Sequence, residues 1–214
     1  MAESDSYRSI AAVSEGLYKD RGSRFMAFAY PVGSEKDVKP LVDALKKEHH
    51  AARHHCFAYR IGSDGAVFRA NDDGEPSGTA GRPILGAIDS AGLSDVLVVV
   101  VRYFGGILLG VPGLVKAYRE AAAAALDNAE KIEKVPVRRL LLEFSYGEMN
   151  EVQKILKAVP GLETVSQDFD MECRMQVDVR LSAVNGFLEK LNQTNNERGT
   201  RIQCRPVQAA PAGD

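Results

Sequence analysis

The sequence lacks several features that mark large classes of proteins. It contains no tryptophan and only three cysteines, Cys56, Cys173 and Cys204, with no C-x-x-C spacing among them. That pattern is typical of a reducing compartment in which thiols stay free. The longest apolar run, Val96–Val101, is far shorter than the ~20 residues that cross a bilayer. Residues 1–5 have neither the basic nor the apolar region of a signal peptide, so we expect a cytoplasmic protein without a membrane segment.

An excess of positive charge is also missing. The 214 residues include 27 Lys and Arg against 29 Asp and Glu, which gives a net charge of −2. Residues 1–134 carry 17 basic and 18 acidic side chains, and residues 135–214 carry 10 and 11. A polycationic domain is therefore excluded, and any nucleic-acid site must be a local patch. What remains is an ordinary globular composition, 45% hydrophobic and 26% charged, in a length that suits one large or two modest domains.

Apolar periodicity predicts a mixed order of strands and helices in residues 1–134. Ser34, followed by acidic residues, is an N-cap signal for the first helix. The run Val96–Val101 has no polar interruption, which is typical of a strand buried on both faces. Two glycine-rich stretches, 71–81 and 103–113, are predicted loops. The predicted strands are 8–18, 24–31, 54–60, 66–70 and 96–101, and the predicted helices are 35–50, 83–91 and 114–131.

The segment Lys134-Val-Pro136 marks a domain boundary. Beyond it the pattern is strand, helix, two strands, helix and a last strand, which is the βαββαβ order of the split βαβ or ferredoxin-like unit. We therefore predict an α+β protein with a mixed domain over residues 1–134 and a ferredoxin-like domain over residues 135–214. The predicted elements of the second domain are strands 138–145, 164–168, 171–181 and 201–207 and helices 148–158 and 183–191.

Three carboxylates, Asp72, Asp73 and Glu75, lie within four residues ahead of a run of small residues. Hard cations prefer carboxylate oxygens, so all three are candidate ligands of a divalent cation. Asp72 and Glu75 are also candidates for acid or base catalysis. The spacing does not fit a calcium loop. We favour a structural interpretation, in which these carboxylates cap the following helix and neighbouring N–H groups.

A second candidate site follows the buried strand. A cation ends the strand, a glycine-rich turn comes next, and two further cations lie early in the following helix. Backbone N–H groups at a helix start favour anions, and glycine lets a phosphate approach closely. The alternative is that the glycines permit a tight turn while the cations pair with the acidic loop. The candidate anion or nucleic-acid site comprises Arg102, Tyr103, Gly105, Gly106, Lys116 and Arg119.

All four histidines, His49, His50, His54 and His55, lie within seven residues, and Cys56 is adjacent. Histidine and thiol are zinc ligands, but successive residues in a strand face opposite sides, and the chain has no second ligand cluster. His54 remains a weak candidate for a catalytic base that pairs with a loop carboxylate. We favour structural or surface roles for the cluster, and we expect no metal and no cofactor.

An ordered set of motifs between residues 23 and 118 resembles the Impact family, in particular its bacterial YigZ-like members. Each motif alone is weak, but the set in this order is specific. One departure is Val111-Pro112, where the family usually has a small residue and glycine; Pro112 removes a backbone donor from the predicted loop. The matching residues are Ser23-Arg-Phe25, His49-x-x-Ala52-x-His54-x-Cys56-x-Ala58-Tyr59, Asp72-Asp-Gly-Glu-Pro76, Gly78-Thr-Ala-Gly81, Val98-Val-Val-Val-Arg-Tyr-Phe-Gly-Gly106 and Gly113-Leu-Val-Lys-Ala-Tyr118.

The resemblance implies a first domain like the second domain of a small-subunit ribosomal protein and domain IV of elongation factor G. It implies a second domain like the ferredoxin-like domain V of that factor. Eukaryotic relatives regulate translation by competing for an activator of a kinase that phosphorylates an initiation factor, and they use an additional domain to do so. We do not expect that kinase-pathway role here, because the chain has no counterpart of that domain.

Three functions follow as hypotheses. The first is a cytosolic regulator of translation that binds RNA or the ribosome through Arg102, Tyr103, Lys116 and Arg119. The second is an enzyme that uses His54 and the acidic loop on a small phosphorylated or amidic substrate. The third is a protein-interaction module with a protein partner in translation control, whose motif residues hold the fold together. We favour the first, with little or no catalysis.

Overall fold

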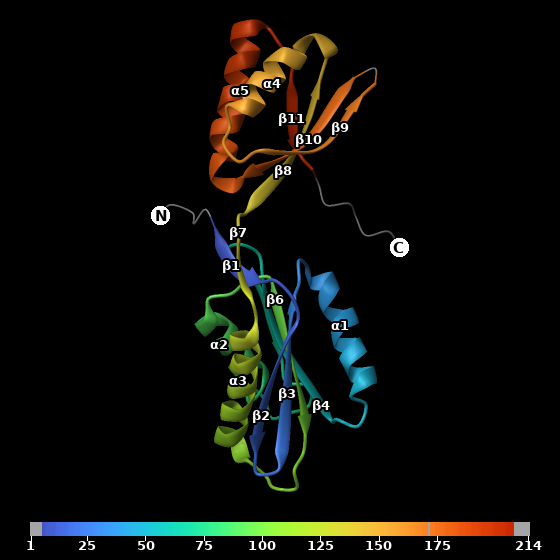
Figure 1. The fold of residues 1–214 in the computed structure, drawn as a ribbon, viewed down its shortest axis with the longest axis vertical. Helices are drawn as coiled ribbons and strands as arrows, with labels where there is room; N and C mark the ends of the chain where they lie inside the picture. The colour runs from blue at the N-terminus through green and yellow to red at the C-terminus, as the bar shows by residue number, and fades with distance from the viewer. Residues whose placement is uncertain (1–5, 171, 208–214) are drawn as a thin grey trace. The chain divides into compact units, whose positions relative to one another are not determined.

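The computed structural model describes residues 6–170 and 172–207, which form two compact units, Ser6–Lys134 and a second unit that begins at Val135 (Figure 1). Both units combine antiparallel sheets with helices, which confirms the α+β class. Within the described residues, no helix has the length and apolar character needed to span a membrane. Residues 1–5, on which the expectation of no signal peptide rests, lie outside the described part.

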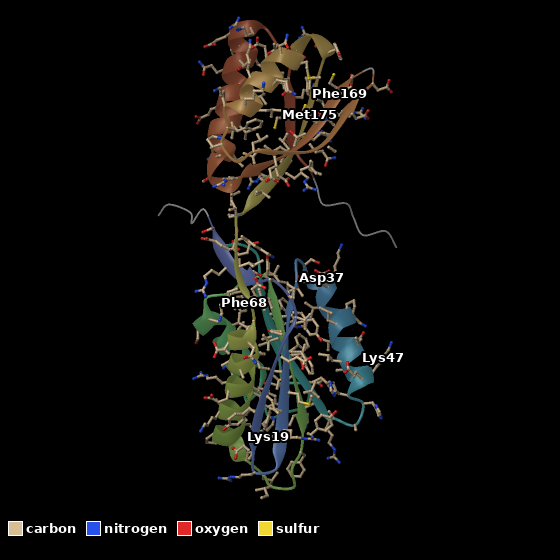
Figure 2. All side chains as sticks on the ribbon, viewed as in Figure 1. Lys19, Asp37, Lys47, Phe68, Phe169 and Met175 are labelled. Carbon is tan, nitrogen blue, oxygen red and sulfur yellow. The ribbon has the colours of Figure 1, made fainter. Side chains whose placement is uncertain are left out.

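The N-terminal unit is built on a five-stranded antiparallel sheet in the order β2-β3-β6-β4-β5. Helices α2 (Gly81–Ala91) and α3 (Gly110–Asn128) cover one face, and α1 (Glu35–Glu48) covers the other. Lys47 projects from α1 away from the sheet (Figure 2). The strands of this sheet are β2 (Ser14–Asp20), β3 (Ser23–Pro31), β4 (His54–Ile61), β5 (Val67–Asn71) and β6 (Val96–Tyr103).

The central strand β6 confirms the prediction of a strand buried on both faces. Each residue of Val96–Val101 is fully buried. Val96, Val98 and Val100 pack with residues of α2 and α3. Leu97, Val99 and Val101 pack with the buried face of α1. Because successive side chains of a strand point to opposite faces, one unbroken apolar run serves two hydrophobic cores.

The predicted strand 8–18 is wrong as a single element. It divides into β1 (Tyr7–Ile10) and β2, and β1 pairs with β7 (Lys131–Lys134) in a separate two-stranded sheet. Strand β7 falls at the end of the predicted helix 114–131 and beyond it. Its residues alternate between exposed and half-buried positions, so it carries little apolar signal.

Helix α3 begins four residues earlier than predicted, at Gly110, inside the expected glycine-rich loop. Pro112 is therefore the third residue of a helix. In the first turn of a helix the backbone N–H groups have no intrahelical partner, so a proline there removes no hydrogen bond. The interpretation of Pro112 as a residue that removes a backbone donor from a loop is corrected accordingly.

The C-terminal unit has the predicted βαββαβ order, with an antiparallel sheet in the order β11-β8-β10-β9. Alternate residues of β10 (Cys173–Arg180) are buried with apolar residues of both helices. Short 3-10 turns, Tyr146–Glu148 and Leu181–Ala183, precede the two helices. The other elements are β8 (Val137–Phe144), α4 (Met149–Lys157), β9 (Glu163–Phe169), α5 (Val184–Arg198) and β11 (Gln203–Pro206).

Candidate functional site

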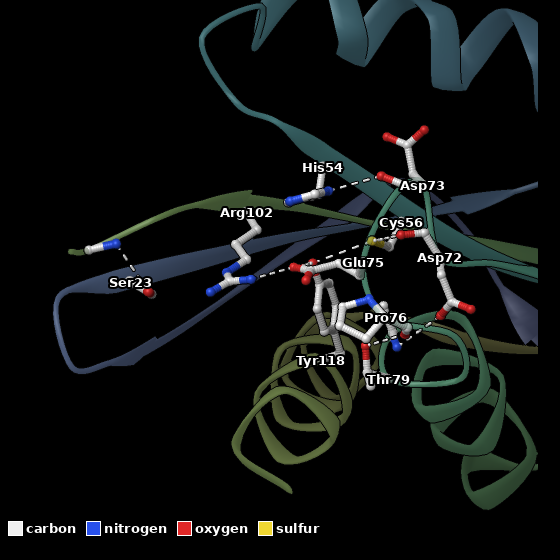
Figure 3. A network of polar contacts seen from close by, with 12 residues as sticks. Ser23, His54, Cys56, Asp72, Asp73, Glu75, Pro76, Thr79, Arg102 and Tyr118 are labelled. Atoms are coloured by element: carbon white, nitrogen blue, oxygen red, sulfur yellow. Dashed lines mark hydrogen bonds and ion pairs between the residues drawn. The ribbon is translucent and has the colours of Figure 1, made fainter. Parts of the chain in front are cut away.

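A buried ion pair lies where β6 ends. Arg102 Nη1 donates to Glu75 Oε1 at 2.5 Å, and the two side chains are only 8% and 4% exposed (Figure 3). The guanidinium carbon also lies 5.5 Å from the ring centre of Phe25 and 5.7 Å from that of Phe104. The partner of Arg102 is therefore the third carboxylate of the acidic loop, and an aromatic ring on each of two segments contacts the cation.

Two neutral groups complete this network. The hydroxyl of Tyr118, on α3, donates to Glu75 Oε1 at 2.8 Å. The Cys56 thiol lies 3.3 Å from that hydroxyl and 3.0 Å from the carbonyl oxygen of Asp72. Burial raises the pKa of both Tyr118 and Cys56, so both keep their protons near neutral pH and act as donors. We call Cys56, Glu75, Arg102 and Tyr118 the Glu75 network.

Asp72 caps the start of α2, as the structural interpretation predicted. Its carboxylate accepts backbone N–H groups of Gly78, Ala80 and Gly81 at 2.8–3.0 Å (Figure 3). Burial opposes ionisation of this carboxyl, but the three N–H donors outweigh it and hold its pKa below the ordinary value. Both oxygens of Asp72 are thus engaged by the loop and helix that follow.

Asp73 points away from the other two carboxylates. Its oxygens accept the backbone N–H of His55 at 2.7 Å and the Lys46 ammonium at 2.9 Å. Within the described residues, no group of three His, Cys, Asp or Glu side chains is arranged to hold a metal ion. The structure therefore does not bring Asp72, Asp73 and Glu75 together as ligands of one cation, because each binds a different part of the fold.

The histidines divide between the two faces of the sheet. His54 pairs directly with Arg102 across β4 and β6, so the two side chains lie on the face covered by α2 and α3. His54 Nδ1 is 2.9 Å from the carbonyl oxygen of Asp73 (Figure 3). His55 is buried on the opposite face. His54 and Glu75 thus lie on the same face of the sheet, as they must if the two side chains are to act together in an enzyme.

The candidate anion site is likewise divided. Arg102 and Tyr103 are consecutive in β6 and face opposite sides of the sheet. The Tyr103 hydroxyl lies 2.9 Å from His49 Nδ1, and its ring lies 5.3 Å from the Arg24 guanidinium carbon. The two side chains therefore do not form one phosphate and stacking site. Phe104, which follows them in the chain, is 55% exposed to solvent.

The remaining members of that candidate site differ in exposure. A Cβ on Gly105 would lie 1.9 Å from the carbonyl carbon of Gly22, so the loop backbone packs directly on the tip of the β2–β3 hairpin. Gly106 has φ +87 with open space beside it. Lys116 and Arg119 are both exposed on α3. Gly105 therefore has a packing role, whereas Lys116 and Arg119 are accessible to a partner.

A pocket of about 230 Å³ opens beside the Glu75 network. It is lined by Arg53, His54, Arg102, Phe104 and Leu108. None of Arg53, Phe104 and Leu108 is among the site residues predicted from the sequence. Arg53 precedes β4 and Leu108 precedes α3, and only the pairing of β4 with β6 brings these two segments together.

The buried His55 predicts how stability depends on pH. Burial lowers its pKa below the ordinary 6.5, against the opposing attraction of Asp73. Below pH 6.5 the unfolded chain takes up a proton that folded His55 does not, so the free energy of unfolding should fall as the pH falls toward the folded pKa. Urea denaturation across a pH series would measure this slope. A slope that is unchanged in His55→Leu would contradict the assignment to this side chain.

The chain is a protein of two α+β units, and in the first unit a glycine-rich loop follows the buried Arg102–Glu75 ion pair. Residues 21–126 match the Impact N-terminal domain family. A Haemophilus influenzae IMPACT family member is 34% identical over 82% of this chain and 86% of its own. Escherichia coli IMPACT family member YigZ is 34% identical over 79% and 83%. The crystal structure of a hypothetical protein superposes with a TM-score of 0.70 at 30% identity, covering 95% of this chain and 98% of its own. The chain therefore belongs to the IMPACT family.

Proposed function

We propose that this chain is a cytoplasmic regulator of translation that contacts RNA through one end of its N-terminal unit. The single observation that carries the proposal is an exposed aromatic ring set among exposed cations at that end. We call this surface the basic end, and it consists of Arg21, Arg24, Arg53, Phe104 and Lys116, all exposed. Family membership supports the link to translation, since the resemblance implies that role for eukaryotic relatives.

The contacts within the fold support the grouping of Arg21, Arg24, Arg53 and Phe104, whereas Lys116 lies in the second turn of α3, the helix that follows the glycine-rich loop. The hairpin tip at Arg21–Gly22 packs on the backbone of Gly105. Arg24 lies opposite Tyr103 in the pairing of β3 with β6, and Arg53 and Phe104 line the same pocket. Single-stranded RNA is held by cations along its backbone and by aromatic rings on which bases stack. The basic end offers both kinds of group, whereas Arg102 supports the loop from inside.

The Lys116→Ala and Arg53→Ala variants test this function. With fluorescently labelled single-stranded RNA, anisotropy should show saturable binding whose affinity falls steeply with salt. Each variant should weaken binding and reduce the slope of log affinity against log salt by about one. Lys190→Ala is the matched control, because Lys190 is an exposed cation on α5 in the other unit. Binding that is independent of salt, or equally weakened by the control, would contradict the proposed surface.

A further inference from the structure

We propose that the pocket beside the Glu75 network binds a small carboxylate carried on an apolar body. The pocket is lined by three basic side chains, Arg53, His54 and Arg102, and by two apolar ones. The lining includes no acidic side chain, since Glu75 lies behind Arg102 and is paired with it. This inference concerns a small molecule and does not depend on RNA binding.

The guanidinium of Arg102 has one buried nitrogen without a hydrogen-bond partner in the described part of the chain. Nη1 is bonded to Glu75, while Nε is buried and has no hydrogen-bond partner among the described residues. In Figure 3 the other nitrogen atoms of Arg102 point away from Glu75. Leaving a buried donor unsatisfied is costly. The Nε and Nη2 edge is the planar fork that binds a carboxylate through two parallel hydrogen bonds.

The approach to this edge depends on Phe104. Its ring lies over the guanidinium, with 5.7 Å from Arg102 Cζ to the ring centre, and is 55% exposed. Gly106, two residues later, has φ +87 and open space around it. The bound state requires the Phe104 side chain to rotate toward solvent, so that the Nε atom, which is buried in the free protein, becomes accessible to the ligand. The same ring then offers an apolar surface to the body of the ligand.

The donors favour a carboxylate over a phosphate. His54 Nδ1 faces a carbonyl oxygen and therefore carries a proton, and in that tautomer of the imidazole Nε2 is an acceptor. A phosphate dianion needs donors for three oxygens and would meet that lone pair. A carboxylate needs only the two donors of the Arg102 edge, Nε and Nη2. His54 Nε2 is then free to accept a hydroxyl or amide donor that the ligand carries beside its carboxylate.

The size and lining of the pocket limit the body of the ligand. Its volume of about 230 Å³ is below the ~300–1,000 Å³ of pockets for drug-sized molecules. Phe104 and Leu108, which is 81% exposed, supply the apolar walls. A single ring or a short branched chain fits these walls, so benzoate is a suitable probe.

The test is a titration of the full chain with benzoate, followed by the NMR signal of the Arg102 Nε–H group. Saturable shifts of this signal are expected with benzoate, and no saturable shift with benzamide or inorganic phosphate at the same concentrations. Leu108→Asp should weaken benzoate binding by about tenfold or more, because it places a like charge at the rim. Val111→Asp is the matched control, since Val111 is 56% exposed nearby but does not line the pocket.

The Arg102→Lys variant distinguishes loss of the bidentate donor from loss of folding. A lysine keeps a cation against Glu75 but cannot form a bidentate pair, so the variant should stay folded by circular dichroism and lose benzoate binding. Benzoate binding that survives in Arg102→Lys or in Leu108→Asp would overturn the proposal. So would phosphate that competes with benzoate on equal terms, or the absence of any saturable shift. No RNA is present in this titration, so its failure leaves the RNA proposal standing.

Discussion

Arg102→Met should lower the free energy of unfolding of the N-terminal unit by about 3–5 kcal/mol, because it leaves a buried carboxylate without its cation. The Glu75 side chain is 4% exposed, and among the described residues its carboxylate would retain only the hydroxyl of Tyr118 as a partner. The chain has no tryptophan, so far-UV circular dichroism in urea is the appropriate measurement. A loss well below this range would mean that the guanidinium is not the group that makes the buried charge tolerable.

A double variant tests whether the loss of stability comes from leaving Glu75 unpaired or from the substitution at position 102 itself. Arg102→Met with Glu75→Met removes both charges and should recover most of the lost stability, since a buried ion pair is often no better than apolar side chains of similar volume. Lys39→Met is the control within the same unit. Lys39 forms an exposed ion pair with Asp43, and its removal should leave stability almost unchanged. Equal losses in Arg102→Met and in the double variant would contradict the pairing.

Gly105→Ala should destabilise the same unit by about 1–3 kcal/mol, the usual cost of forcing extra atoms into a packed region. The added Cβ would lie 1.9 Å from Gly22 C and 2.1 Å from Ser23 N, and both are backbone atoms that cannot move aside separately. The loop and the hairpin tip would therefore separate. Amide hydrogen exchange at Gly105, whose N–H donates to the Ser23 hydroxyl at 3.1 Å, reports the separation directly.

Gly86→Ala is the matched control for that substitution. Gly86 lies inside α2, and a Cβ there would have only Arg119 Nη2 in contact, at 3.8 Å. Alanine in a helix interior should stabilise the unit by up to about 1 kcal/mol. If both variants lower stability equally, the close approach of Gly105 to Gly22 is not the cause.

Elements with a strong apolar period were predictable from the sequence, and elements formed by pairing alone were not. The unbroken apolar run Val96–Val101 predicted a strand buried on both faces. The spacing of apolar residues predicted the βαββαβ order of the second unit. Strand β7 is four residues long and pairs with β1 over more than one hundred residues of sequence. A short pattern of that kind carries no local signal for its distant partner.

The same limit applies to the candidate site. The cap formed by Asp72 was predictable, because it acts on N–H groups within ten residues. Pairing of the cations with the acidic loop was one of two alternatives that the sequence left open, and the sequence did not show which carboxylate pairs with Arg102. That choice depends on the register of β4 against β6, which sets His54 opposite Arg102. Composition likewise could not show that Arg102 and Tyr103 face different cores.

The pairing of β1 with β7 has a consequence for how this unit is built into longer chains. Tyr7 lies opposite Lys134, so the first and last strands of the unit begin and end at the same point. A domain whose entry and exit coincide can be inserted into a host protein, or given a new neighbour, through short joints that leave its sheet intact. Recombination between genes can therefore transfer Ser6–Lys134 as one unit, because its first and last strands pair with each other.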